Sequence, residues 1–363
     1  MAIPAILRSS VKRHICCIAL VALAACEQSA ATGADPFDIA LPAPEVLVSL
    51  ESELLGQPTD LEVDGSGLLW VADAANKRVV AIGEDGEVAR TIGSEGEGPG
   101  EFQAPVTIAV NDTIVRVIES RLMRVQDYRP DGRHITDHVV PSQFLGAGAL
   151  AIDGRLVLPS LGRDSALAHV RRVTDSTSIR LGPPVAPAPA GFDFAAMKAV
   201  IAEGRVPDEF RNSVTPVVGE DAIWLLVQSE SEVRKYTPSG ALAWNEVLQV
   251  PEIEHARREF QRKNAEEPNP ARIYSLQAMV AAREVGDDLW ILMLGATGAD
   301  AVFYLLDEET GAMRGRLSVA TPAPVSQFTV DPDRNRLYLA VMEEASILVV
   351  DLAGVDDRVL RGQ

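Results

Sequence analysis

Acidic side chains recur at the turns that follow six similar apolar strands in this chain. They are Asp73, Glu119, Asp164, Glu230, Glu232, Asp300, Glu343 and Glu344, and they outnumber the basic residues at these turns, which are Lys77, Arg121 and Arg163. Gathered on one face, such carboxylates would focus negative potential and suit a cationic ligand, a basic partner or Ca²⁺. The alternative is ordinary solvated loop charge with local ion pairing. The sequence holds no compact Asp-x-Asp-x-Asp loop. We therefore predict no metal site and no cofactor, and leave Ca²⁺ or another divalent metal open.

The residue patterns of common hydrolases are missing from the sequence. It contains neither a Gly-x-Ser-x-Gly elbow nor a His-Glu-x-x-His segment. His134 and His138 fall on one predicted outer strand, His169 on a third strand of its repeat, and His255 in an insertion. We expect the first three histidines at the surface, away from any active site, and we assign no catalytic residue.

A repeated strand pattern must position these residues. The six strands are Leu69-Trp70-Val71, Ile114-Val115-Arg116, Leu156-Val157-Leu158, Ile223-Trp224-Leu225, Leu289-Trp290-Ile291 and Leu337-Tyr338-Leu339. A strand and a tight turn such as Asp64-Gly65 precede most of them, and a third strand and a second turn such as Asp85-Gly86 follow. Apart from two longer gaps, the spacing matches the roughly 40–45 residues of a four-stranded propeller blade. The sequence predicts an all-β fold, a six-bladed β-propeller over residues 45–355.

The ends of the repeat and its two long gaps carry further predictions. Blades begin near Pro58, Pro105, Gly146, Ser213, Met279 and Ser326. The sixth blade lacks an outer strand, and we expect the free strand at 45–50 to supply it and close the ring. Residues 183–211 and 251–276 are insertions with helical spacing on the face of the acidic turns. Two short helices should pack together over part of the channel mouth, either as a lid or docking element or merely to cover apolar surface. The basic residues of the second, Arg257 and Arg258 among them, could dock against the acidic turns.

One junction between blades resembles a known repeat. Residues 91–102, Thr-Ile-Gly-Ser-Glu-Gly-Glu-Gly-Pro-Gly-Glu-Phe, followed by Pro105, are similar to the inter-blade segment of NHL-repeat propellers. Val71-Ala72-Asp73 and Asn76-Lys77-Arg78-Val79 resemble that repeat's second and third strands. The resemblance covers the first blade and its junction, and it implies a fold rather than an activity. We expect the glycines to allow a tight crossing between blades, because no helix follows to complete an anion site.

The first 25 residues have the make-up of an export signal. Arg8, Lys12 and Arg13 precede an apolar run over 15–25, which is too short for a bilayer that takes roughly 20 residues to span. The run ends Leu23-Ala24-Ala25-Cys26, which resembles the lipobox of bacterial lipoproteins and implies cleavage before a lipidated Cys26. An ordinary secretory peptide is the alternative. In that family, Glu27 rather than aspartate implies the outer membrane, with the protein facing the periplasm.

The composition of the chain after residue 25 predicts its tether, its tail, its lack of disulfides and its charge. Residues 26–44 are small, polar and proline-marked, which predicts a flexible tether, and 356–363 is a C-terminal tail. The three cysteines are Cys16, Cys17 and Cys26, so the mature chain has no disulfide. Removing residues 1–25 takes away three basic and no acidic residues, and the net charge falls from −19 to −22. This acidity disfavours nucleic acid as a partner.

We therefore predict a non-catalytic binding or assembly module, anchored by lipid to the bacterial cell envelope. It would bind an envelope protein or a small ligand on the propeller face bearing the insertions. The candidate residues are Asp73, Glu119, Arg121, Arg163, Asp164, Glu230, Glu232, Arg257, Arg258 and Asp300. The first alternative is a metal-dependent hydrolase or lyase with its site on the propeller axis, and the second is redox chemistry on a bound quinone cofactor.

Overall fold

The computed structural model describes residues 37–140, 148–295 and 300–355. The predicted signal peptide, Cys26, Gly146 and the tail at 356–363 lie outside them. Blades 1 to 3 consist of β3 (Pro58–Val63), β4 (Leu69–Asp73), β5 (Arg78–Ile82) and β6 (Val88–Ile92); β7 (Pro105–Val110), β8 (Val115–Glu119), β9 (Arg124–Tyr128) and β10 (His134–Val139); and β11 (Ala149–Leu150), β12 (Arg155–Pro159), β13 (Ala168–Arg172) and β14 (Ile179–Leu181).

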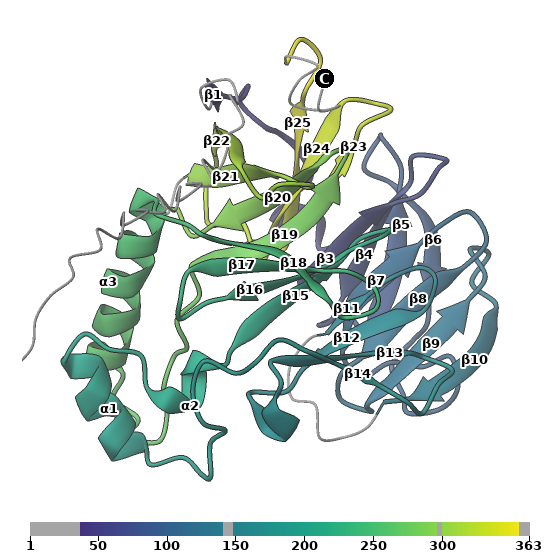
Figure 1. Cartoon of the computed structure of the whole chain (residues 1–363). Coiled ribbons are helices and arrows are strands. Elements are labelled where there is room, and N and C mark those ends of the chain that lie inside the picture. Colours follow the sequence, from purple (N-terminus) through teal and green to yellow (C-terminus); the bar gives the residue numbers. More distant parts are fainter. Residues whose placement is uncertain (1–36, 141–147, 296–299, 356–363) are drawn as a thin grey trace, which may run out of the picture. The chain divides into compact units, whose positions relative to one another are not determined.

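Blades 4 to 6 continue the same order from the axis outwards (Figure 1). They consist of β15 (Val214–Val218), β16 (Ile223–Val227), β17 (Glu232–Tyr236) and β18 (Leu242–Val247); β19 (Met279–Val285), β20 (Asp288–Met293), β21 (Asp300–Asp307) and β22 (Met313–Ala320); and β23 (Gln327–Asp331), β24 (Arg336–Val341) and β25 (Ser346–Asp351), with β2 (Glu45–Val48) outermost. The innermost strands of successive blades contact one another, and β23 contacts β3, so the six blades form a closed ring. The predicted six-bladed propeller is confirmed.

The large residues of the repeat pattern form the core between blades. Trp70, Trp224 and Trp290 occupy the second strands of blades 1, 4 and 5, and each is 0% exposed. In blade 1 the indole Nε1 of Trp70 donates to Asp64 Oδ2 at 2.8 Å, so the turn before the strand also satisfies the buried ring nitrogen. Aromatic side chains at these positions fill the widening space between adjacent twisted sheets.

An N-terminal strand completes blade 6, as predicted. Strand β2 pairs antiparallel with β25, with Glu45 opposite Val349 and Val48 opposite Ile347. Val48 is 3% exposed, so its side chain contributes to the core as well as to the ladder. The two ends of the propeller thus share one sheet, which protects an edge that an open ring would leave unpaired.

The segment predicted as a tether is partly folded. Residues Phe37–Ala40 form β1, a fifth strand that pairs parallel with β22 of blade 5. The prediction of a flexible tether over 26–44 is therefore wrong for these residues. The segment was not predicted as a strand because proline and small residues surround it. Its apolar residues nevertheless alternate, and Ile39 and Leu41 pack into the core of blades 5 and 6.

Both insertions contain helices, and these pack together as predicted. The first holds α1 (Phe194–Ala202) and α2 (Asp208–Arg211), and the second holds α3 (Pro251–Glu266). Helices α1 and α3 are in contact at the rim of the ring (Figure 1). They do not extend over the channel mouth, because Ile253, Ala256 and Phe260 of α3 bury their side chains in the core between blades 4 and 5. Two single-turn helices, η1 (Leu50–Ser52) and η2 (Arg163–Ser165), lie in loops, and no helix of the described part of the chain could cross a membrane.

Candidate functional site

Two of the predicted rim carboxylates are buried and hold loops in place. Asp73 is 0% exposed, and its Oδ1 accepts the backbone N–H groups of Gly56 and Gln57 at 3.1 and 2.9 Å. Glu119 is equally buried, and its Oε1 and Oε2 both accept the N–H of Ala104, at 3.0 and 2.9 Å. Each side chain ends the second strand of its blade and fastens the loop that enters the first strand. Their oxygens are occupied by this structural role.

The rim residues of blade 4 meet the insertions. Glu230 accepts from Arg211 at 3.0 Å, and the Arg257 guanidinium donates to the Ser229 carbonyl at 3.0 Å. Arg257 of the basic helix thus contacts this rim through a backbone carbonyl, and docking of the helix against the acidic side chains stays a prediction. Glu232 bonds to Arg234 at 2.8 Å, within its own blade.

The other predicted residues are dispersed over several loops, a strand and a helix. Arg121 and Arg258 are exposed, and Asp164 has an exposed side chain 3.9 Å from His169. Arg163 begins η2, and Asp300 is the first residue of β21 and half-buried. Across the described ranges, no three His, Cys, Asp or Glu side chains are grouped so as to hold a metal ion. A shared site for these side chains on the insertion face stays a prediction.

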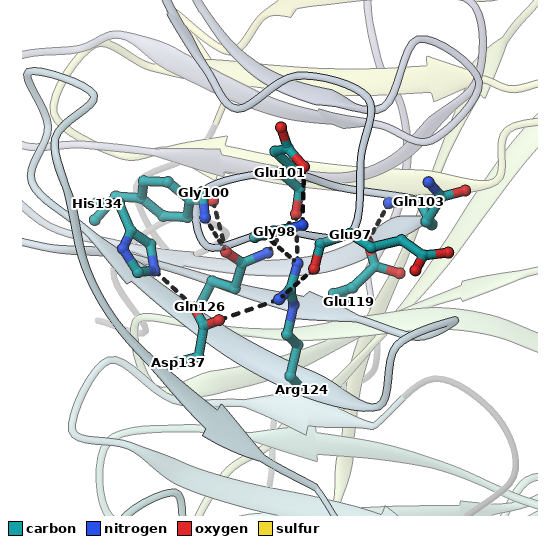
Figure 2. Close-up of polar contacts among 11 residues, drawn as sticks. Glu97, Gly98, Gly100, Glu101, Gln103, Glu119, Arg124, Gln126, His134 and Asp137 are labelled. Atoms are coloured by element: carbon teal, nitrogen blue, oxygen red, sulfur yellow. Dashed lines mark hydrogen bonds and ion pairs between the residues drawn. The ribbon is translucent and has the colours of Figure 1, made fainter.

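The glycine-rich junction between blades 1 and 2 is held by blade 2 side chains. Figure 2 shows Arg124 reaching into the loop, where it donates to the carbonyls of Gly98 and Glu101 at 2.9 and 2.7 Å. Gln126 accepts the N–H of Gly100 at 3.0 Å and donates to the Glu101 carbonyl at 2.8 Å. Gly100 has φ of 83°, a conformation that other residues rarely adopt. Backbone groups of Gly98, Gly100 and Glu101 thus form hydrogen bonds with side chains of blade 2, in agreement with the structural role expected of the glycines.

The histidines lie away from the axis, as expected, but one of them is not at the surface. His134 and His138 are on the outer strand β10, bonded to Asp137 at 2.6 Å and to Asp127 at 3.2 Å. His169 is only 5% exposed on β13, so its predicted surface position is wrong. Burial lowers its pKa, which favours the neutral ring. Its neighbours Ala168 and Val170 are buried as well, so both faces of β13 are covered at this point.

Sequence reasoning missed an ionic cluster on the propeller axis. The inner strands surround a cavity of about 810 Å³ lined by Asp60, Glu62, Arg283 and Glu284 among mostly apolar and small residues. Arg283 of blade 5 bonds to Asp60 of blade 1 at 2.6 Å and also to Glu62. Its Nε donates to the carbonyl of Phe328 in blade 6 at 2.5 Å. The signal was present in the sequence, since Asp60 and Glu62 alternate with apolar residues on an inner strand.

The axial carboxylates do not suit a divalent metal. Burial raises the pKa of both Asp60 and Glu62, and the positive charge of Arg283 acts in the opposite direction. Asp60 Oδ2 also accepts the N–H of Ile108 at 2.9 Å. A metal would have to displace the guanidinium from both carboxylates, so the residues present fit an ion-paired strut between blades better than a metal site.

The first insertion carries three phenylalanines that form an aromatic patch. The ring of Phe192, which is 48% exposed, lies 6.4 Å from that of Phe194 and 6.5 Å from that of Phe210. Asp193 caps α1 by accepting the N–H groups of Ala195 and Ala196, each at 3.1 Å. Phe194 therefore lies on a capped helix, Phe192 precedes the cap, and Phe210 lies on α2.

Polar side chains fix the first insertion to the ring and to the second insertion. Asn212, 1% exposed, accepts the N–H of Val185 at 2.9 Å and donates to the Ala186 carbonyl at 2.8 Å. Lys198 of α1 donates to the Asn269 carbonyl at 3.0 Å, which joins the two insertions.

The aromatic patch was not predicted as a site, because the helical spacing of Phe194 indicated a buried face.

Comparison with known proteins supports the fold. No family model matches the chain, and no curated protein matches it either. The WD40 repeats of RRP9 align over 86% of this chain and 99% of theirs, with a TM-score of 0.51 and 12% identity. A putative exported protein from Bacteroides fragilis aligns over 87% and 98%, with a TM-score of 0.50 and 13% identity. At these identities the likeness shows a propeller fold alone.

Proposed function

We propose that this chain is a non-catalytic binding or assembly module of the bacterial envelope, anchored by a lipid on Cys26. In this proposal it is an NHL-like propeller at the outer membrane, facing the periplasm, and it recognises an envelope protein on the insertion face. The observation that carries the proposal is the aromatic patch. An exposed phenylalanine that packs against two partly buried ones, beside a capped helix on a rigid ring, is a typical anchor of a protein interface.

The surroundings of the patch indicate the chemistry of the partner. Three acidic residues lie next to the three phenylalanines in the sequence, namely Asp193, Asp208 and Glu209, and one basic residue, Arg211, lies beside them. The whole mature chain is also strongly acidic. A partner that offers apolar side chains within a basic surround complements this surface, because unlike charges speed encounter and orient the two proteins. Nucleic acid does not fit the same description, since its backbone is anionic.

Truncating the patch should abolish capture of the partner. Phe192→Ala combined with Phe194→Ala is expected to raise the Kd at least about 30-fold, as loss of a hot spot of roughly 2 kcal/mol implies. The measurement is affinity capture from native membranes, followed by titration of the captured protein in purified form. The matched control removes two exposed apolar side chains on outer strands, Ile135→Ala with Leu242→Ala, and should bind as the parent does. Equal loss in both variants, or in neither, contradicts the proposed surface.

Replacing the lipidated cysteine tests the anchor. Cys26→Ser should remove incorporation of labelled palmitate and release the protein from sedimented membranes, because the thiol that accepts the lipid is gone. Cys17→Ser changes a cysteine inside the apolar run and should leave both readouts unchanged. Palmitate labelling that survives in Cys26→Ser would contradict the proposed anchor.

The alternative function, a metal-dependent hydrolase or lyase with its site on the axis, stays a prediction, as does a role for Ca²⁺. Stoichiometric metal in protein purified without chelator, lost in Asp60→Asn with Glu62→Gln, would favour it. Redox chemistry on a quinone cofactor predicts a coloured protein, and absorbance of the pure material decides it.

A further inference from the structure

Strand β1 fixes the place where the N-terminal segment joins the propeller. Phe37 pairs with Gly315 and Ala40 with Ser318 on β22. The missing side chain of Gly315 makes room for the Phe37 ring, since a Cβ there would lie 2.2 Å from it. Asp38 pairs with Arg316 at 3.1 Å, and the N–H of Leu41 donates to the Ser318 carbonyl at 2.7 Å. The notch, which is the space left by Gly315, holds this strand on blade 5 together with the Asp38–Arg316 ion pair and the buried Leu41.

The direction of β1 determines the face from which the chain arrives. In each blade the turns between first and second strands and between third and fourth strands lie on one side, which we call the turn face. Strand β22 starts after the turn at Thr310 and Gly311, on the turn face, and ends towards the insertion face. Since β1 is parallel to β22, Phe37 lies at the turn-face end and the preceding residues enter from there.

The chain between the proposed lipid and β1 is short. Ten residues, 27–36, separate Cys26 from Phe37, and a chain of that length spans at most about 35 Å when fully extended and nearer 20 Å on average. To reach the insertion face it must first run back along β22 from Gly315, opposite Phe37, to Ala320, a distance of about 17 Å. About half of the extended length, and nearly all of the average length, would be used before any membrane is reached.

We infer that the turn face of blade 5 is directed towards the membrane and that the insertion face, with the aromatic patch, points away from it. This inference rests on the lipid anchor of the proposed function. It places the recognition surface where a periplasmic protein can approach it without meeting the bilayer. The turn face of blade 5 is the surface next to the lipid headgroups.

Energy transfer to the membrane from each face tests the orientation. The mature chain has no cysteine besides Cys26, so Glu309→Cys on the turn face and Glu343→Cys on the insertion face each accept one donor dye. Both glutamates are exposed, and both changes remove the same charge. Lipidated full-length protein is added to preformed phosphatidylethanolamine–phosphatidylglycerol vesicles that carry a headgroup-linked acceptor. Transfer from position 309 should exceed that from 343 at least about twofold, given about 26 Å between the faces.

Releasing β1 provides the matched comparison. Gly315→Val places a side chain in the notch, so the strand should leave β22 and lengthen the tether, and the two positions should then give similar transfer. Equal transfer or stronger transfer from 343 in the parent protein overturns the inferred orientation while the anchor stands. Absence of lipid on Cys26, measured by mass spectrometry of the same sample, overturns the anchor and the inference with it.

Discussion

Arg283→Met should lower the free energy of unfolding by about 3–5 kcal/mol, the cost of breaking a buried ion pair from one side. The guanidinium joins three blades, since it bonds to Asp60 and Glu62 in blade 1 and to the Phe328 carbonyl in blade 6 from its own position in blade 5. Its removal leaves two carboxylates on the axis without their cation. Chemical denaturation followed by tryptophan fluorescence measures the loss.

The chain offers a matched control and a rescue for this variant. Arg334 also connects blades 6 and 1, through Asp331 at 3.1 Å and the Ser66 carbonyl at 2.8 Å, but it is more exposed. Arg334→Met should therefore cost less than about 1 kcal/mol. Adding Asp60→Asn and Glu62→Gln to Arg283→Met should restore most of the lost stability, because no buried charge then remains unpaired. If Arg283→Met costs no more than Arg334→Met, the axial cluster is not a strut.

Asp288→Asn should become more stabilising as the pH rises, by about 1.4 kcal/mol between pH 5 and pH 8. Burial raises the pKa of Asp288 from its ordinary 3.8 to about 6, with Arg314 at 3.3 Å opposing the shift. Because the folded-state pKa is raised, the folded protein holds this proton more tightly than the unfolded chain does. The stability that protonation contributes is present at low pH and is lost as the pH rises through 6. Asparagine carries no such proton, so its stability does not follow that curve.

The comparison is a denaturation series at several pH values for the two proteins. Asp287→Asn is the control, since Asp287 is the exposed neighbour of the buried aspartate and its change should alter the unfolding free energy by less than about 0.5 kcal/mol at each pH. A difference between Asp288→Asn and the parent that is constant from pH 5 to 8 would show that Asp288 is ionised throughout.

The repeat was readable from the sequence because each blade needs the same local pattern. A large apolar residue such as Trp70 and a turn residue such as Asp64 recur at blade spacing, and they predict strand, turn and neighbour together. The closing strand was predictable for a related reason, since blade 6 lacked a fourth strand and residues 45–50 lacked a partner. No missing strand in a blade indicated β1 in the same way. Its four residues depend on the notch at Gly315, and nothing near Phe37 in the sequence indicates that glycine.

The candidate site was less predictable, because the binding partner of a charged loop residue cannot be inferred from the sequence. Asp73 and Glu119 look like solvent-facing acids in the sequence, yet backbone N–H groups from the entering loop surround them. Arg283 and Asp60 are far apart in the chain and meet only because ring closure brings blades 5, 6 and 1 together around the axis. Phe192 was overlooked for the opposite reason, since exposure of an aromatic side chain is a tertiary property.

The pairing of β2 with β25 also sets the order in which the protein can fold. Strand β2 is among the first segments of the propeller to be synthesised, and its partner β25 is among the last. Until β25 arrives, Val46 and Val48 have no ladder to join, and the contact that closes the ring is the most distant in sequence. Loop closure over so long a chain is slow, so the chain would spend its longest unfolded interval with the final blade incomplete. Chaperones would bind the protein at that stage, and a chain truncated before Ser346 would never leave it.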